Sequence, residues 1–506
     1  MLRCAYAVVL AVGALSACAK APTTKDLATE AAMAMGGADR LRGIQTLQMT
    51  GGEGTRFRHG QTPGIADREP AARLTRVTET ADLAHGRASL DYVVEVAGFS
   101  QHRHEILTKK GSALVGLENV EGRPLSVMSP SGLFSWGTHN DPSLLLRRNI
   151  VTVILAAMDT AVDEAPQNRD MDGLMLKYGR ATLPSGDEVG LYFDPATKLL
   201  HAYETVDTET MLGDVPARYV LGDYRDVSGV RLPHQITITK AVLPYADISF
   251  TAATINDPKA AAVFDIPNAA QAEADVAIAA GDYSSVTLVP VATGVMLARA
   301  YSHNSLVVEF PTYLAVVEAP YTNAQSATLV RALTTQFPGK PVRYVAPTHH
   351  HYDHIGGIRG LAAVGAITVV EQGHEPPVRA VLGAPHTRPA DALETARKAD
   401  ARRGVIESYN GMRTITEGAQ RLELHAIRGN PHAEPLVIAY VPASGVVFQS
   451  DVWFPGLGVP AGPDAAHLLK SIQSMPMQPK IHVGGHGGVG PHDELVKAVA
   501  AMKVAE

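Results

Sequence analysis

The sequence contains very little cysteine. Its two cysteines, Cys4 and Cys18, both lie at the extreme N-terminus of a 506-residue chain. If the segment before Cys18 is removed on export, no disulfide can form in the mature chain. No thiol is then available for a metal site either, so metal ligands must come from histidines and carboxylates. An exported chain without disulfides relies on its hydrophobic cores, and this one is long enough for two of ordinary size.

The sequence also lacks any long run of one charge. It has 44 Lys and Arg residues against 51 Asp and Glu residues, a net charge of −7, and 46% hydrophobic residues. This composition is typical of a soluble globular protein and gives no electrostatic signal for nucleic-acid binding. There is also no Gly-rich phosphate-binding loop, which a flavin domain would need. We therefore expect a small-molecule substrate and no nucleic-acid partner.

A long apolar run is missing as well, including at the N-terminus. Arg3 is followed by a short apolar core from Ala5 to Leu15, whereas a spanning helix needs about 20 residues. Residues 1–17 are predicted to be an export signal. The segment ends in Leu15-Ser16-Ala17-Cys18, which resembles a bacterial lipobox. The resemblance implies that Cys18 is lipidated and anchors the chain to a membrane. Because no Asp follows Cys18, it also implies that the anchor lies in the outer membrane, facing the periplasm. The alternative is a plain secretory signal cut nearby.

The first half of the chain is predicted to be mainly β structure. Residues 18–43 read as a tether and a short helix that stops at Gly36-Gly37, and residues 44–268 as an antiparallel β domain with turn signals between its strands. One helix is expected from Pro142 to Ala161. The pattern around residues 223–233 resembles the curved half-barrel of periplasmic lipoprotein carriers. That resemblance implies a concave sheet that binds an acyl chain or presents substrate; a packing domain is the alternative.

The second half, residues 275–506, follows a small polar linker and alternates apolar strands with helical patterns. Strands are expected at 286–291, 295–299, 305–310, 313–319, 342–346, 421–427, 436–441 and 446–450. Helices are expected at 324–337, 391–403, 465–472 and 493–502. This succession predicts an α/β sandwich of layers.

The most informative stretch is Thr348-His349-His350-His351-Tyr352-Asp353-His354-Ile355-Gly356-Gly357, on the loop that leaves the strand at 342–346. Histidines and a carboxylate this close together are suited to a site for two metal ions, with zinc as the expected metal. His349 and His351 project alike because one residue separates them. His350 therefore points elsewhere and is not counted as a ligand.

This loop matches the His-x-His-x-Asp-His signature of the metallo-β-lactamase superfamily. Further ligands of that family recur in order: a His after a Gly-containing turn (His432), an Asp closing an apolar strand (Asp451), and a His between glycines (His486). The resemblance, over roughly residues 275–506, implies an αββα fold and two zinc ions per chain, with iron or manganese as alternatives. The ligands it implies are His349, His351 and His432 for the first metal, Asp353, His354 and His486 for the second, and Asp451 as the bridge.

Other candidate residues receive a weaker interpretation. His425, His467, His482 and His492 are taken as ordinary histidines. Glu318, in Glu318-Ala319-Pro320, stands where many members of the superfamily have Asp and is expected to orient a loop or a ligand. Tyr409 is either an oxyanion donor or, more simply, a packing residue. Residues 371–411 are expected to contribute to the rim of the pocket.

The resemblance implies a dizinc hydrolase in which a metal-bridging hydroxide attacks the substrate and Asp353 orients it or takes up a proton. An aspartate bridge resembles the lactonase, thioesterase, phosphodiesterase and sulfatase branches, so an ester, lactone or amide is the expected substrate. A β-lactam or a phosphodiester remains an alternative. Two other classes stay open: a flavodiiron-like oxidoreductase, and a lipid or ligand carrier whose metals are structural.

Overall fold

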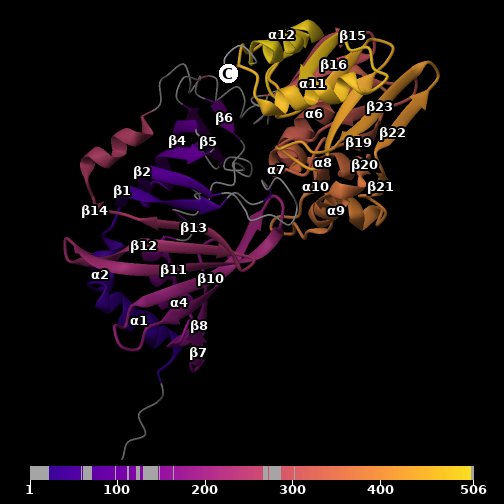
Figure 1. Cartoon of the computed structure of the whole chain (residues 1–506). Helices are drawn as coiled ribbons and strands as arrows, with labels where there is room; N and C mark the ends of the chain where they lie inside the picture. The colour runs from indigo at the N-terminus through magenta and orange to yellow at the C-terminus, as the bar shows by residue number, and fades with distance from the viewer. Residues whose placement is uncertain are drawn as a thin grey trace, which may run out of the picture.

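The computed structural model describes residues 22–57, 60, 71–96, 99–110, 113–120, 126–128, 146, 149–162, 164–265, 272, 286–300 and 303–502. The chain forms two regions, an N-terminal β domain and a C-terminal α/β domain (Figure 1). The proposed signal and Cys18 lie outside the described residues. None of the helices in the described part is long and apolar enough to cross a membrane.

The N-terminal domain is built on one antiparallel sheet with the order β6-β5-β4-β3-β2-β1-β13-β12-β11-β10-β9-β8-β7, and β14 pairs with β1. Strand β13 pairs with β1 although the two strands lie far apart in the sequence. This pairing joins the two halves of the sheet. Its strands are β1 (Thr46–Phe57), β2 (Ala71–Asp82), β3 (Arg87–Val96), β4 (Phe99–Lys110), β5 (Ala113–Val120), β6 (Ser126–Met128), β7 (Gln167–Met171), β8 (Leu174–Thr182), β9 (Glu188–Phe193), β10 (Leu200–Glu209), β11 (Gly213–Val227), β12 (Val230–Lys240), β13 (Leu243–Ser249) and β14 (Ala252–Ile255).

Three helices pack against this sheet and close its core: α1 (Thr24–Ala34), α2 (Ala38–Arg42) and α4 (Ile150–Thr160). Helix α1 begins with a capping box, in which the Thr23 hydroxyl accepts from Asp26 N while the Asp26 carboxylate accepts from Thr23 N. Buried side chains of α1 and α4, such as Leu27 and Ile154, belong to the same apolar cluster as strand residues such as Leu90. The short N-terminal helix is therefore part of the β domain.

The C-terminal domain contains two sheets. The first has the order β15-β16-β17-β18-β19-β20-β21 and the second β22-β23-β24-β25-β26-β27. The first comprises β15 (Thr287–Ala292), β16 (Val295–Arg299), β17 (Ser305–Glu309), β18 (Leu314–Val317), β19 (Val342–Ala346), β20 (Ile367–Glu371) and β21 (Ile406–Tyr409). The second comprises β22 (Met412–Glu417), β23 (Gln420–Ile427), β24 (Leu436–Val441), β25 (Val446–Gln449), β26 (Ile481–Gly484) and β27 (Val489–Pro491).

The two sheets pack face to face, and helices cover their outer faces. Along β24, Val437 and Ala439 point into the core between the sheets, whereas Leu436 and Ile438 point into a separate core under α11 (Pro463–Gln473) and α12 (His492–Met502). On the other side, α6 (Asn323–Gln336), α8 (Ile358–Ala363), α9 (Glu375–Gly383) and α10 (Ala392–Ala399) cover the first sheet. The predicted four-layer αββα arrangement is present, and apolar residues on both faces of β24 account for its continuous burial.

In the C-terminal domain, apolar patterns located β15 to β19 and β23 to β25 but missed β20 to β22, β26 and β27. The strands predicted at 295–299 and 342–346 have those bounds in β16 and β19. The helix predicted from residue 391 to 403 is too long, because α10 ends at Ala399. Asp400 leaves the helical region at φ −144°, and its carboxylate accepts a hydrogen bond from Arg402 N. Of the helix predicted from Pro142, the described part is Ile150–Thr160 with Leu146, and much of the rest lies outside the described residues.

The two regions meet at the turn between β10 and β11. Met211, in this turn, belongs to the same core as Tyr352 and Leu361 of the C-terminal domain. The Asp214 carboxylate accepts hydrogen bonds from Thr387 N and Thr387 Oγ1, both at 2.7 Å. Gly60 O accepts from Tyr352 N at 2.9 Å, so the β domain contacts the residue next to His351. Figure 1 shows the helix of this loop, α7 (Tyr352–Ile355), on the side that faces the β domain.

Candidate metal centre

The histidine-rich loop leaves β19 at the edge where the two sheets meet, and it ends in α7. His351 occupies the N-cap position of α7 with an extended backbone, φ −63° and ψ 144°. This change of backbone direction turns Asp353 and His354 back toward the histidines that precede them. All four predicted ligands of the loop are buried, and His349 and His354 have no exposed surface.

His349, His351, His432 and Asp451 form one cluster. One ligand atom from each lies within 4.8 Å of the others. His349 Nε2 lies 3.3 Å from His432 Nε2, and Asp451 Oδ2 lies 3.0 Å from His432 Nε2 and 3.8 Å from His349 Nε2. Three imidazoles and a carboxylate therefore converge as the first predicted ligand set requires.

A second cluster lies beside the first and contains Asp353, His354, His486 and a residue that was not predicted, His303. Asp451 joins the two clusters, because its Oδ2 lies 3.1 Å from His354 Nε2 and its Oδ1 lies 2.8 Å from His486 Nε2. One carboxylate thus contacts histidines from both predicted ligand sets. The structure brings all seven predicted ligands together.

Asp451 is held in an unusual backbone conformation at the end of β25. Its φ is 67°, in the left-handed region that non-glycine residues seldom adopt. Glu318, after β18, has φ 69°. Such conformations cost about 1–3 kcal/mol each and are found mainly where surrounding structure enforces them, often at functional sites. Here they direct two carboxylates into the space between the sheets.

Glu318 has the supporting position expected from the sequence. Its Oε1 lies 3.1 Å from His354 Nδ1, which leaves His354 Nε2 directed toward Asp451. The Thr348 hydroxyl donates to Glu318 Oε1, and Ser450 Oγ donates to Glu318 Oε2 at 3.4 Å. Glu318 itself has no exposed surface. A carboxylate behind a histidine sets the tautomer and the orientation of the ring.

Burial and neighbouring charges shift the histidine pKa values in opposite directions. Burial lowers the pKa of His351 to about 3, with a further contribution from His432, and burial also lowers the pKa of His349. For His354, burial acts downward, but the carboxylates of Asp451, Glu318 and Asp353 outweigh it and the pKa is raised. The centre therefore contains neutral imidazoles beside one that is held close to three carboxylates.

The two carboxylates of the centre are ionised despite their burial. Burial alone would raise the pKa of Asp353 and of Asp451, but nearby histidines outweigh it and both pKa values are lowered. For Asp353 the main opposing contributions come from His354 and His303. Neutral imidazoles and ionised carboxylates around one space form a donor set that zinc, iron or manganese can use. The residues present therefore fit a pair of divalent metal ions.

The other histidines are placed outside these clusters. His350 is buried but belongs to neither cluster and faces the His374 ring, 5.3 Å between centroids. His482 contacts His492, His425 contacts Glu423, and His467 contacts Arg428 O. Tyr409 lies in the core between the two sheets, so the packing alternative describes its position.

His303 is the residue that sequence analysis missed. It lies in the connection between β16 and β17, where Tyr301-Ser302-His303-Asn304 contains no pattern typical of a ligand. The only local signal is a lone histidine and asparagine directly before a buried strand. Burial lowers its pKa to about 3.

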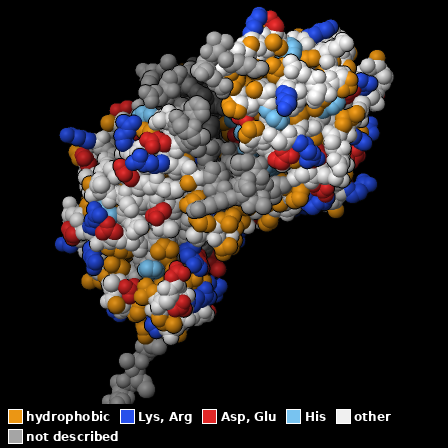
Figure 2. Space-filling model, in the orientation of Figure 1, with side chains coloured by type: hydrophobic (Ala, Val, Ile, Leu, Met, Phe, Trp, Pro, Cys, Tyr) orange, Lys and Arg blue, Asp and Glu red, His pale blue; other side chains and the backbone are white. Residues whose placement is uncertain are grey.

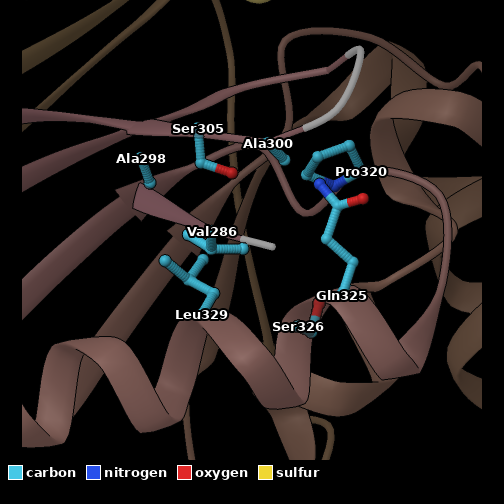
Figure 3. A pocket seen from close by; sticks show the side chains of 8 residues that line it. All are labelled: Val286, Ala298, Ala300, Ser305, Pro320, Gln325, Ser326 and Leu329. Carbon is cyan, nitrogen blue, oxygen red and sulfur yellow. The ribbon is translucent and has the colours of Figure 1, made fainter. Parts of the chain in front are cut away.

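A small pocket lies behind this connection (Figure 3). Its walls come from the first sheet and from α6, and Gln325 extends along one side toward Ala300 and Pro320. Its lining contains none of the predicted ligands, so it is not where a substrate would meet the centre. On the outer face shown in Figure 2, basic and acidic side chains are interspersed over both regions.

Comparisons with known proteins concern the C-terminal region. Residues 299–463 match the sequence profile of the metallo-beta-lactamase superfamily, a span that includes six of the seven predicted ligands; His486 lies beyond its end. Among curated proteins, none matches the chain.

Solved structures similar to this region share little sequence with it. A metallo-beta-lactamase from Pontibacter korlensis is 17% identical, with a TM-score of 0.32, over 43% of this chain and 99% of that protein. A metallo beta lactamase from Hirschia baltica is 20% identical, with a TM-score of 0.30, over 42% and 96%. The flavodiiron core of Flv1 from Synechocystis sp. is 15% identical, with a TM-score of 0.32, over 43% and 60%.

Proposed function

We propose that the chain, whose residues 299–463 match the profile of the metallo-beta-lactamase superfamily, is a metal-dependent hydrolase that uses two zinc ions to cleave an ester, lactone or amide. The observation that carries this proposal is the position of Asp451, whose two oxygens lie 2.8–3.1 Å from histidines of both ligand sets. A single carboxylate shared in this way is suited to hold two cations together. Iron or manganese in place of zinc is compatible with the same donors.

His349, His351 and His432 would hold the first ion, Asp353, His354 and His486 the second, and Asp451 both. When bound, the ions supply a water of lowered pKa and Lewis-acid stabilisation of negative charge. Glu318 keeps His354 Nδ1 occupied, so that His354 Nε2 faces the centre. Asp353, ionised and next to this space, would orient the attacking water or hold the proton that it loses.

The proposed substrate class rests on the aspartate at position 451. An aspartate bridge resembles the lactonase, thioesterase, phosphodiesterase and sulfatase branches more than the thiolate-containing lactamase branch. We place the activity in the cell envelope, with Cys18 lipidated and the chain anchored at the outer membrane facing the periplasm. The β domain, in contact with the loop at Tyr352, would then help to present a small-molecule substrate.

The test is to purify the chain from Thr23 onward, which retains the complete capping box of α1. Metal content is measured by mass spectrometry, and the same sample is assayed with chromogenic esters, lactones, phosphodiesters and a cephalosporin. We expect close to two zinc ions per chain and turnover of one carbonyl substrate class. Metal ions at both positions without any hydrolysis would contradict the proposed function, and cephalosporin turnover alone would replace the substrate class.

A further inference from the structure

His303 lies inside the second cluster of the metal centre. Its Nε2 lies 3.1 Å from Asp353 Oδ2, and its ring centroid is 3.8 Å from that of His486 and 5.0 Å from that of His354. One ligand atom from each of these four residues lies within 4.8 Å of the others, which is the same criterion that the first cluster meets. His303 is also 99% buried. Position and burial thus match those of the predicted ligands.

The backbone around His303 is fixed from two sides. Gln325 Nε2, from α6, donates to His303 O at 3.1 Å. On the other side, Asn304 N donates to Gly485 O at 2.7 Å, and Asn304 Nδ2 donates to Gly484 O at 3.0 Å and Gly487 O at 3.1 Å. The segment is therefore joined to the loop that carries His486. Figure 3 shows the Gln325 side chain extending from α6 toward Ala300 and Pro320.

The hydrogen bonds of Asn304 join the two segments that carry His303 and His486. They link the β16–β17 connection of the first sheet to the β26–β27 loop of the second. The edge of the His303 ring also meets the Tyr321 ring, with centroids 4.2 Å apart. A histidine that only filled space would not need its neighbour Asn304 to donate three hydrogen bonds to the loop that carries His486. Held in this way, His303 is pre-organised for a role at the centre.

We propose that His303 is an additional protein ligand of the second metal ion. This inference rests on the proposed function, because it assumes that the centre binds two ions. The second ion would then have donors from His303, Asp353, His354 and His486 as well as the shared Asp451, and the first ion would have three histidines and Asp451. The two positions therefore differ in donor number.

The difference in donor number has a consequence for metal choice. Zinc in proteins is usually four-coordinate, and the first position suits it. A position with five protein donors suits an ion that accepts six ligands, such as manganese or ferrous iron. The second position should therefore accept manganese or iron more readily than the first does.

The experiment compares wild-type protein with His303→Ala and His303→Gln. Gln can donate a hydrogen bond to Asp353 but is a poor metal ligand, so it separates ligation from mere orientation of Asp353. His482→Ala is the matched control, because His482 is also fully buried, lies four residues before His486 and belongs to neither cluster. Apo-protein of each variant is titrated with Co²⁺, followed by visible absorption and equilibrium metal content, and with Mn²⁺ in competition with zinc. Circular dichroism verifies folding.

We expect wild type and His482→Ala to bind two equivalents. His303→Ala and His303→Gln should bind the first equivalent normally and the second about a hundredfold more weakly or worse, with a changed Co²⁺ spectrum for that equivalent only; loss of an outer-shell partner already costs ~10–100-fold. Recovery of the second equivalent by Gln, or normal binding by both variants, would overturn the inference while leaving the proposed function intact. Wild-type protein that binds two ions but hydrolyses nothing would overturn the function alone. A wild type that binds no metal would overturn both.

Discussion

Both regions of the molecule bury acidic side chains, but they treat the charge in opposite ways. In the β domain, Glu79 is 7% exposed and sits on β2 between Met49 of β1 and Leu90 of β3. Burial alone raises its pKa to about 7. In the C-terminal domain, Asp353 is equally buried and the Asp451 side chain is 11% exposed, yet histidines around them lower their pKa values.

Burial therefore does not by itself decide the charge of an acid. Among apolar neighbours, burial favours the protonated form; among imidazoles, the ionised form prevails. The C-terminal domain thus keeps negative charge in its interior, which needs a positive partner. A bound metal ion would supply that partner, whereas burial leaves Glu79 to hold a proton. Substitutions of these acids and of their partners test this difference between the two regions.

Removal of the shared carboxylate should have the largest effect. Asp451→Ala should lose metal from at least one position and reduce kcat by about a thousandfold, well beyond the ~10–100-fold cost of removing a partner behind a ligand. Metal content and turnover are measured on the same sample. Asp493→Ala, an exposed acid paired with Lys497 on α12, is the control. Full metal occupancy with normal turnover in Asp451→Ala would refute the bridging role.

Glu79 should make the β domain less stable as the pH rises. Its folded pKa, about 7, lies above the ordinary value of 4.5, so the folded state holds the proton more tightly than the unfolded state. The contribution of Glu79 to the stability of the β domain is therefore highest below pH 4.5. It decreases up to about pH 7, by roughly 3 kcal/mol in total.

Glu79→Gln tests this at nearly constant shape. The variant should unfold with higher stability than wild type at pH 8 and with little difference at pH 4.5. Calorimetry and urea unfolding of the full chain at both pH values measure the change. The same pH dependence in both proteins would show that Glu79 is not the titrating group.

Glu318→Gln should weaken metal binding without removing a ligand. Gln cannot hold His354 Nδ1 as a carboxylate does, so metal affinity should decrease by about 10–100-fold. Competition with a chelator measures the metal affinity. Glu371→Gln is the matched control, because Glu371 is also a buried acid but pairs with Arg428 outside the two metal clusters. Equal losses in both variants would indicate a general cost of losing a buried charge.

The smallest effect is expected at the contact between the regions. Asp214→Asn weakens the two hydrogen bonds from Thr387, each worth about 1 kcal/mol. We expect faster hydrogen exchange at residues 385–388 and at Tyr352, with kcat reduced only a few-fold. Asp226→Asn, whose acid accepts from Gly229 within its own hairpin, is the control. Unchanged exchange would mean that the Asp214 carboxylate does not help to join the regions.

The two-domain organisation and part of the elements followed from local patterns. The strand at 342–346 was visible from its apolar run, and the end of α1 from its Gly36-Gly37 stop. The end of α10 was missed, since it depends on the turn that Asp400 makes with Arg402. The order of the large sheet was also out of reach, because β1 pairs with β13 across two hundred residues of chain.

The ligands were predictable for a related reason. His349, His351, Asp353 and His354 lie within one loop, where spacing fixes the direction of each side chain, and the remaining ligands follow characteristic turns. His303 has neither advantage. It lies 50 residues before Asp353, in a connection without a motif, and only the antiparallel pairing of β16 with β17 and the bonds of Asn304 bring it to the centre.

Seven candidate ligands and their order could be recognised from the sequence, because local spacing and turn chemistry depend on neighbouring residues. Apolar runs also located eight strands of the C-terminal domain. Only the tertiary structure decided that Glu318 supports His354, that His303 joins the second cluster, and that the β10–β11 turn packs beside the metal loop. It also decided the opposite pKa shifts of Glu79 and Asp451. Those properties depend on burial and on distances between residues far apart in the chain, which no local pattern records.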